Sequence, residues 1–298
     1  MEQSSAVTLR DVALRAGVHV ATASRALDPG QAHLVNPTTR TRVRVSAEEL
    51  GYQGNAIARS LRKGSSGTLG VVVVDLSNPF VVPLLRGIER ESRAGDYLPL
   101  IAETHDQHAL LSETIDRLLR HRVDAVIMSA AHLDLEDVVN RLERRVPVVL
   151  AVRGYSGFPS TSPHNEVVHD DAQGARMAVS HLAELGHRTI AQLPANIREI
   201  ASFASRSVGF TAAVANLGLR DASTGDYALE PSLAEGRRLA TDLLRRPAAE
   251  RPTAIFAHND LMAVGAIDAL REAGLRCPED VSVVGYNDAP LSDHLDPA

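Results

Sequence analysis

The chain has 298 residues, of which 44% are hydrophobic and 23% are charged, and this is typical of soluble globular proteins with two or three domains. The longest unbroken apolar stretches, such as residues 71–74, are too short to cross a bilayer, and residues 1–20 have no signal-peptide pattern. Cys277 is the only cysteine, so neither an intrachain disulfide nor a cysteine-built zinc site can form. These features exclude a membrane-spanning or disulfide-stabilised secreted protein and predict a cytoplasmic one.

Charge is distributed unevenly along the chain. Residues 1–67 contain nine basic and five acidic side chains, a net charge of +4, whereas the whole chain carries −6, so residues 68–298 carry −10. A basic head on an acidic body is expected when only the head meets a polyanion such as DNA. Chance clustering of arginines on solvated helices would give the same count, so the charge alone does not decide between the two interpretations.

Residues 8–51 predict three short helices. Thr8, with an acid three residues later, predicts a helix N-terminus, and Gly17 predicts the turn that ends this helix. A second helix is predicted over residues 19–27 and a third over residues 36–51, where an Asn-Pro pair begins it and a glycine ends it. Two short helices joined by a glycine turn form a helix-turn-helix. We expect the second helix to enter the major groove, where Arg25 can bind guanine O6 and N7.

Long motifs run through residues 8–63: Thr-Leu-Arg-Asp-Val-Ala, then Ala-Gly-Val-x-x-Ala-Thr-x-Ser-Arg, Glu-Glu-Leu-Gly-Tyr and Asn-Ala-Ile-Ala-Arg-Ser-Leu. They resemble the head of the lactose-repressor/galactose-repressor family. The resemblance implies a DNA-binding head at residues 1–54 and a hinge helix with linker at residues 55–67. It implies base reading by the second helix. The DNA-binding residues that it implies are Thr8, Val20, Ala21, Thr22, Ser24, Arg25, Asn55, Ala58, Arg59 and Leu61.

The resemblance makes residues 55–61 a hinge helix, with Leu61 as an apolar wedge in the minor groove. Isolated helices need roughly 12–15 residues, so we expect this one to order only with DNA and a partner hinge. The alternative for Leu61 is an ordinary core leucine. His19 stands where the family usually has a serine or threonine cap, and Gly54 stands where it has proline. We expect a less well capped recognition helix and a looser junction.

Beyond a flexible linker at residues 64–67, apolar β-branched segments alternate with helical patterns. Strands are predicted over residues 69–75, 98–102, 124–129, 147–152, 189–193, 253–257 and 281–286. Helices are predicted over residues 83–94, 109–120, 172–185, 203–217, 233–245 and 261–273. Such alternation predicts parallel sheets covered on both faces. A break rich in Pro, Ser and His near residues 157–165 predicts two lobes rather than one sheet.

The body also carries a set of motifs: Leu-Ser-Asn-Pro-Phe at 76–80, His-Leu-Ala-Glu-Leu-Gly-His-Arg-Thr-Ile at 181–190, Arg-Ser-Val-Gly-Phe at 206–210, Ala-His-Asn-Asp at 257–260 and Val-Val-Gly-Tyr-Asn-Asp at 283–288. They resemble the effector domain of the same family, which has the fold of periplasmic sugar-binding proteins. The expected fold is therefore a small all-α helix-turn-helix head plus an α/β periplasmic-binding-protein-like body, residues 68–298, of two parallel-sheet lobes that bind effector and dimerise. The effector-binding residues implied are Asn78, Phe80, Arg206, Asn259 and Asn287.

Several of these residues follow predicted strands, where open α/β sheets bind ligands. Amide and guanidinium groups suit hydroxyl or anionic ligands. The alternatives are that each asparagine only forms a turn and that Arg206 faces a carboxylate. Val152 stands where the family commonly has an aspartate that contacts sugar hydroxyls, and the chain has no tryptophan to stack on a sugar ring. A sugar or related metabolite is thus expected from the family rather than from the residues.

Two other classes of protein, an enzyme and a transport binding protein, fit the sequence less well. An enzyme is disfavoured, because the chain has no Gly-x-Ser-x-Gly, P-loop or Gly-x-Gly-x-x-Gly motif, and residues 105–108, two histidines around Asp-Gln, are interpreted as a polar loop. We therefore expect no catalytic residue, cofactor or metal. A transport binding protein would carry an export signal instead of a basic head.

The predicted function is that of a sequence-specific transcriptional regulator. We expect a homodimer that binds a palindromic operator in double-stranded DNA, responds to a small-molecule effector and does not engage a membrane, with repression favoured over activation. The family usually continues beyond the position of Ala298, through a third crossover and back into the first lobe. We expect this last segment to be missing.

Overall fold

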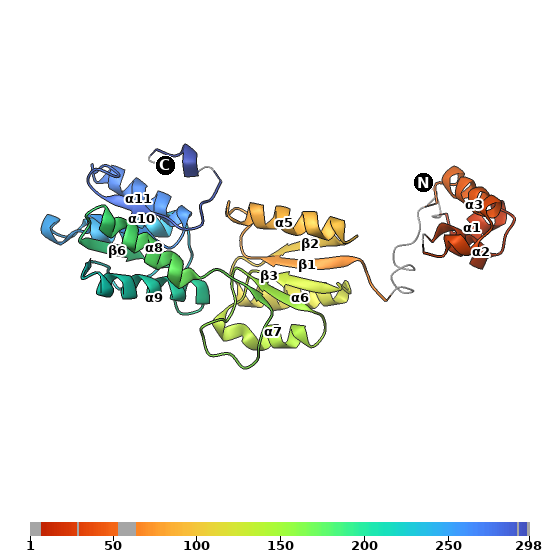
Figure 1. Cartoon of the computed structure of the whole chain (residues 1–298), viewed down its shortest axis with the longest axis horizontal. Helices are drawn as coiled ribbons and strands as arrows, with labels where there is room; N and C mark the ends of the chain where they lie inside the picture. Colours follow the sequence, from red (N-terminus) through yellow and green to blue (C-terminus); the bar gives the residue numbers. More distant parts are fainter. Residues whose placement is uncertain (1–6, 29, 53–63, 291, 297–298) are drawn as a thin grey trace. The chain divides into compact units, whose positions relative to one another are not determined.

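The computed structural model describes residues 7–28, 30–52, 64–290 and 292–296 (Figure 1). Contacts divide the chain into two compact units, Met1–Ser66 and Gly67–Ala298, here called the head and the body. The predicted hinge helix at residues 55–61 lies outside the described residues. In the described part of the chain, no helix is long and apolar enough to span a membrane.

The described residues of the head form three α-helices and one short 3-10 helix: α1 (Leu9–Arg15), α2 (Val20–Leu27), η1 (Ala32–Leu34) and α3 (Pro37–Glu49). They bury one small core, formed by Val12, Ala13, Ala16, Ala23, Ala26, Val35, Val43 and Ala47. The start of α1 is a full capping box, because the Thr8 hydroxyl accepts from the Asp11 backbone and the Asp11 carboxylate accepts from the Thr8 backbone. The predicted helices and this cap are therefore confirmed.

Two further contacts fix the helices of the head. His19 does cap α2, since its Nδ1 accepts a hydrogen bond of 3.2 Å from the backbone N–H of Ala21. The expectation of a less well capped recognition helix was thus wrong, because an imidazole nitrogen can replace the usual hydroxyl. Arg42 of α3 donates from Nε to the backbone oxygen of Ala16 at 2.8 Å and so ties the end of α1 to α3.

The first lobe of the body is built on a five-stranded parallel sheet in the order β2-β1-β3-β4-β5. Its strands are β1 (Thr68–Val73), β2 (Leu98–Glu103), β3 (Ala125–Met128), β4 (Val148–Ala151) and β5 (Glu166–Val167). Its α-helices are α5 (Val81–Ala94), α6 (His108–Arg120) and α7 (Glu136–Glu143). Figure 1 shows α5 on one face of the sheet and α6 with α7 on the other, as the two separate core clusters require.

The second lobe has a four-stranded parallel sheet in the order β7-β6-β8-β9. Its strands are β6 (Thr189–Leu193), β7 (Arg220–Asp221), β8 (Ala254–Ala257) and β9 (Ser282–Val284). Its helices are α8 (Asp171–Glu184), α9 (Ala201–Asn216), α10 (Leu233–Leu244) and α11 (Asp260–Glu272). Helices α8 and α9 cover one face, and α10 and α11 cover the other (Figure 1). Gly236 and Gly265 let α10 and α11 pack closely, since a Cβ at Gly265 would lie 2.1 Å from the backbone oxygen of Leu233.

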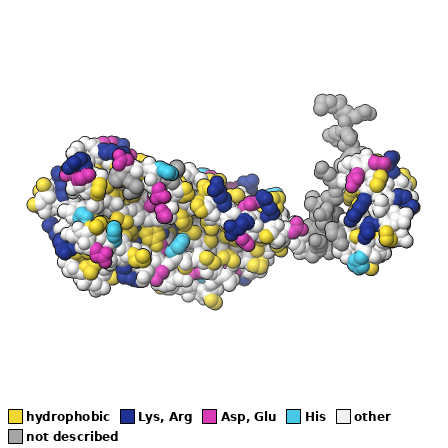
Figure 2. All heavy atoms as spheres, turned by 45° about the horizontal axis from the view of Figure 1, so that its top comes forward, with side chains coloured by type: hydrophobic (Ala, Val, Ile, Leu, Met, Phe, Trp, Pro, Cys, Tyr) yellow, Lys and Arg dark blue, Asp and Glu magenta, His cyan; other side chains and the backbone are white. Residues whose placement is uncertain are grey.

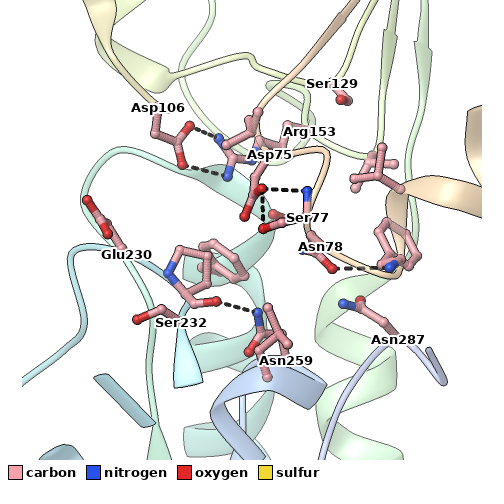
Figure 3. Close-up of a pocket in the computed structure, with 18 of the residues that line it drawn as sticks. Asp75, Ser77, Asn78, Asp106, Ser129, Arg153, Glu230, Ser232, Asn259 and Asn287 are labelled. Carbon is pink, nitrogen blue, oxygen red and sulfur yellow. Dashed lines mark hydrogen bonds and ion pairs between the residues drawn. The ribbon is translucent and has the colours of Figure 1, made fainter. Parts of the chain in front are cut away.

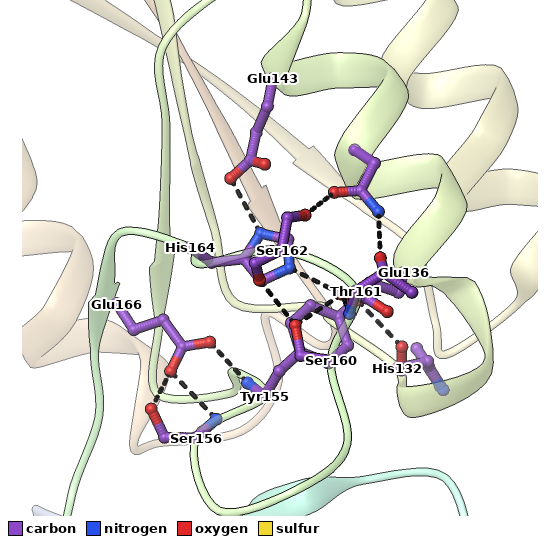
Figure 4. A network of polar contacts seen from close by, with 11 residues as sticks. His132, Glu136, Glu143, Tyr155, Ser156, Ser160, Thr161, Ser162, His164 and Glu166 are labelled. Carbon is purple, nitrogen blue, oxygen red and sulfur yellow. Dashed lines mark hydrogen bonds and ion pairs between the residues drawn. The ribbon is translucent and has the colours of Figure 1, made fainter.

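All seven predicted strands and six predicted body helices are present, but α7, β5 and β7 were not predicted. The predicted break at residues 157–165 is not the lobe boundary, because this segment is fastened to α7 (Figure 4). Ser160 donates to Glu136, and buried His164 contacts Glu136 at 3.1 Å and Glu143 at 3.0 Å. These partners explain why a polar segment packs here. The chain passes to the second lobe after β5.

Candidate functional site: a helix face in the head and a cavity between the lobes

The predicted base-reading residues share one surface of α2. Val20, Ala21 and Arg25 are exposed, whereas Ala23 and Ala26 on the opposite side are fully buried in the core of the head. In the described part of the chain, the side chain of Arg25 has no hydrogen-bond or ion-pair partner, so its guanidinium is available to a ligand. Figure 2 shows basic side chains over the visible face of the head, with a few acidic ones among them.

The other predicted DNA-binding residues divide into three groups. Thr22 and Ser24 lie on α2 and are partly buried beside the exposed face. The Thr8 hydroxyl is engaged by Asp11 at 2.7 Å, so this side chain has a capping role in the head. The remaining predictions fall outside the described residues, namely Asn55, Ala58, Arg59 and Leu61.

The body contains a cavity of about 420 Å³ between its two lobes, at the carboxyl ends of both parallel sheets (Figure 3). The structure brings all five predicted effector residues to this cavity. The lining residues are Val74, Asp75, Ser77, Asn78, Phe80, Val81, Leu84, His105, Asp106, Ser129, Val152, Arg153, Ser202, Phe203, Arg206, Glu230, Pro231, Ser232, Leu233, Asn259, Leu261 and Asn287. This volume lies within the range of about 300–1,000 Å³ that is common for small-molecule sites.

Arg206 lies on α9 and is only 3% exposed. Its Nε donates to Asp171 at 2.8 Å, its Nη1 donates to the backbone oxygen of His258, and its guanidinium lies 3.6 Å from the ring centroid of Tyr286. Burial, together with the Arg206 charge, lowers the pKa of His258 well below its usual value, so this histidine is neutral. Arg206 therefore holds α8, α9 and the end of β8 together at the wall of the cavity.

The three asparagines use their amides differently. Asn259 is fully engaged, since it caps α11 through Met262 at 2.8 Å and donates to the Pro231 backbone oxygen at 2.8 Å. The Asn78 oxygen accepts from the Phe80 backbone at 3.1 Å, which leaves its NH₂ group toward the cavity (Figure 3). Among the described residues, the side chain of Asn287 has no hydrogen-bond partner, and its backbone φ is 116°. Asn78 and Asn287 are thus better placed to bind a ligand than Asn259.

An ion pair between Asp106 and Arg153, which was not predicted from the sequence, lies at the cavity. Arg153 donates from both terminal nitrogens to the two oxygens of Asp106, and its Nη2 lies 3.0 Å from Oδ2. Burial alone would raise the pKa of Asp106, but the hydrogen bond to His132 and the Arg153 charge outweigh it and hold the pKa well below its usual range. Both residues follow strands, β2 and β4, and this position was the signal that could have identified them.

Two carboxylates at the cavity, those of Asp75 and Glu230, form no ion pair with a basic side chain among the described residues. Asp75 accepts two hydrogen bonds from Ser77 through one oxygen only, and the carboxylate of Glu230 has no partner among the described residues (Figure 3). Phe80 from the first lobe and Phe203 from the second add apolar rings. Both lining arginines are already paired with carboxylates, so the groups left for a ligand are mainly hydrogen-bond acceptors and amides.

Comparison with known proteins identifies the family. The family described as bacterial regulatory proteins, lacI family, matches residues 8–55, and the periplasmic binding protein-like domain matches residues 179–298. The chain belongs to the LacI family. Its members are DNA-binding transcriptional regulators rather than enzymes, and so is this protein.

Particular relatives resemble the chain over nearly its whole length. It is 33% identical to the HTH-type transcriptional regulator GalS of Salmonella typhimurium over 294 residues, which cover 98% of this chain and 83% of that protein. The Lac repressor dimer bound to operator and the anti-inducer ONPF matches with a TM-score of 0.82 and 27% identity, covering 97% of this chain and 84% of that one. The transcriptional regulator CelR in complex with cellobiose matches with a TM-score of 0.68 and 29% identity, and the match covers 98% of this chain and 86% of the CelR chain.

Proposed function

We propose that the protein is a homodimeric repressor that binds a palindromic operator and is controlled by a neutral, sugar-like effector in the cavity of the body. Residues 1–54 form the DNA-binding head, residues 55–67 the hinge and linker, and residues 68–298 the effector-binding and dimerisation domain. The observation that supports DNA binding best is the exposed face of α2, on which Arg25 lies unpaired in a head of net positive charge.

In this proposal Val20, Ala21 and Arg25 read bases in the major groove, while Thr22 and Ser24 lie near phosphates. The minor groove is contacted by Asn55, Ala58, Arg59 and Leu61, and the leucine acts there as an apolar wedge.

The body provides the dimer interface. Large apolar side chains are exposed on α5 and at the edge strand β2, including Val82, Leu98 (62% exposed) and Ile101, and this surface suits a second copy. The Lac repressor neighbour is itself a dimer.

The charges of the cavity favour a neutral ligand over an anion. Arg153 is paired with Asp106 and Arg206 with Asp171, so neither guanidinium has a charge left to balance a phosphate. Asp75 and Glu230 would repel an anion but accept hydrogen bonds from hydroxyl groups. Phe80 and Phe203 offer apolar faces to the C–H groups of a sugar. CelR was solved with cellobiose, which agrees with a carbohydrate-like effector.

The regulatory step follows from the position of the cavity. A ligand that contacts both lobes binds one lobe arrangement more tightly than another and so shifts the population that can hold DNA. In this proposal, contacts of the ligand with Asn78 in the first lobe and with Asn287 in the second provide the difference in affinity between the two lobe arrangements.

DNA binding is tested by mobility shift on the intergenic DNA beside the protein's own gene, across a salt series. Arg25→Ala is expected to lower specific binding by about 1–3 kcal/mol and to relax preference at one base pair. Arg44→Ala removes the same charge from α3 and is expected to weaken operator and random DNA equally. If Arg25→Ala binds both DNAs as the parent does, the base-reading assignment is wrong.

Effector class is tested by calorimetry with matched pairs of a neutral sugar and its phosphate ester. We expect the neutral sugar of each pair to bind more tightly than its phosphate ester. The Glu230→Gln variant should reduce this difference in affinity. Tighter binding of the phosphate esters by the parent would contradict the proposed charge preference.

A further inference from the structure

One buried histidine in the first lobe has an unused ring nitrogen. His132 is 3% exposed, and in the part of the chain that the structure describes its Nδ1 is the only buried side-chain nitrogen or oxygen with no hydrogen-bond partner. Such groups are rare, because burial without a partner costs free energy. The rest of the residue is held firmly, since its backbone oxygen accepts from the Tyr155 hydroxyl at 3.0 Å (Figure 4).

Two further metal-ligating side chains converge on this nitrogen. His108 begins α6 in the first lobe, and Glu199 precedes α9 in the second. One ligand atom from each of His108, His132 and Glu199 lies within 4.8 Å of the other two. The rings of His108 and His132 have centroids 4.8 Å apart, and Nδ1 of His132 lies 4.0 Å from Glu199 Oε2. Two imidazoles and a carboxylate are a ligand set suited to zinc.

The other nitrogen of His132 is fixed as the chemistry of a metal ligand requires. Nε2 lies 3.0 Å from Asp106 Oδ1, and this carboxylate accepts, so in the neutral ring Nε2 carries the proton and Nδ1 presents a lone pair. Asp106 is itself held by Arg153. Histidines that bind metals commonly donate their second ring N–H to a carboxylate, which fixes the tautomer and the ring orientation.

We propose that the body binds a divalent transition-metal ion of the zinc class through His108, His132 and Glu199, and that this ion links the two lobes. A water molecule can complete a tetrahedral set. In such a set, bonds of about 2.0–2.1 Å bring the ligand atoms to roughly 3.3 Å from one another, closer than they lie here. His108 and Glu199 can make this movement, because their side chains are 40% and 44% exposed.

Glu199 is already near its place in the proposed site. The backbone oxygen of Glu199 accepts from the Leu133 N–H at 2.7 Å, which is a contact between the lobes beside His132. In the described part of the chain its carboxylate accepts one hydrogen bond, from Asn196 at 3.0 Å. An ion at this position favours the lobe arrangement that brings His132 and Glu199 together. The site lies next to the effector cavity through Asp106, yet it depends only on the geometry of the body and not on the identity of an effector.

The rival explanation is a direct ion pair between a doubly protonated His132 and Glu199. The 4.0 Å separation is too long for a hydrogen bond. The two explanations differ in a measurable way, since a direct pair binds no ion.

The test is metal binding by the full, untagged chain after treatment with a chelator. We expect Zn²⁺ calorimetry to show one tight site per chain, and Co²⁺ to give the visible absorption of tetrahedral coordination. His108→Ala and Glu199→Gln are each expected to weaken binding at least tenfold. His105→Ala is the matched control, because it removes an exposed histidine three residues away and should leave the tight site unchanged.

Stability provides a second readout. Saturating Zn²⁺ should raise the thermal midpoint of the parent and of the His105→Ala variant but not that of Glu199→Gln, whose fold is checked by far-ultraviolet circular dichroism. The proposal is overturned if the parent binds no stoichiometric ion, or if His108→Ala and Glu199→Gln bind Zn²⁺ as tightly as the His105→Ala control.

Discussion

Replacing Asp171 by asparagine tests the role of the buried ion pair at the wall of the cavity. The two side chains are each 4% exposed, and the substitution keeps the shape of Asp171 while removing its charge. Arg206 then remains buried without its hydrogen-bonded counter-charge. Removing one partner of a buried pair costs about 3–5 kcal/mol of unfolding free energy. Tyr286 still stacks on the guanidinium, an interaction worth about 2 kcal/mol when desolvated, so we expect a loss near the lower end, about 3 kcal/mol.

The matched control is an exposed pair in the same lobe. Arg237 and Glu272 lie 2.7 Å apart with side chains 51% and 53% exposed, so Glu272→Gln should cost no more than about 1 kcal/mol. Both variants are measured by urea unfolding with circular dichroism. Hydrogen exchange of α8 and α9 then locates the effect of Asp171→Asn.

A double variant completes the cycle. Asp171→Leu with Arg206→Met replaces the pair by apolar groups and should recover much of the stability lost in either single variant. If Asp171→Asn costs no more than Glu272→Gln, Arg206 does not depend on this carboxylate, and the assignment of its charge to the lobe rather than to the effector is refuted.

Three further predictions concern the body. Gly265→Ala should destabilise the second lobe by about 1–3 kcal/mol in urea unfolding, because the new Cβ meets the Leu233 backbone oxygen. Gly87→Ala, with open space around it, should be neutral or stabilising, and equal effects of the two substitutions would contradict the close packing of α10 and α11. Burial opposes protonation of His164, but its hydrogen bonds to Glu143 and Glu136 outweigh burial and raise its pKa. The stabilisation that the protonated ring provides is therefore complete below pH 6.5 and is lost as the pH rises through the raised pKa. His164→Gln should remove this decline of the urea midpoint at alkaline pH. Val152→Asn should raise the thermal midpoint, since a β-branched residue at φ 70° is strained and asparagine tolerates this region; a lower midpoint would show that the valine contacts matter more.

The sequence predicts the fold well where periodicity and caps are strong. The capping box at Thr8, the N-cap and proline that begin α3, and the seven apolar strand segments all appear in the structure. It fails where tertiary partners decide the local structure. Helix α7 is short and polar outside Val138, Val139 and Leu142, and two-residue strands such as β5 carry no period of their own. The segment before β5 looks like a linker only while its partners on α7 are unknown.

The candidate site could be predicted only in part. Family motifs and strand ends point to Asn78 and Arg206, and both line the cavity. The pairing of Arg206 with Asp171 could not be derived, because the two residues lie 35 positions apart and meet only when α8 packs on α9. The same reason hid the convergence of His108, His132 and Glu199. Their grouping depends on the contact between the lobes, which no spacing in the sequence reveals.

Both sheets of the body are parallel, so the loops that line the cavity all leave the same end of each sheet. Many of the polar lining residues lie in these loops, among them Asp75, Asn78 and Glu230, whereas Phe203 of α9 belongs both to the cavity wall and to the core. Ligand preference can therefore be re-engineered loop by loop. Exchange of residues 75–80 or 229–232 would alter the recognition chemistry, while the hydrophobic layers that determine folding stay untouched. A regulator with this division is a suitable scaffold for biosensors that report new small molecules.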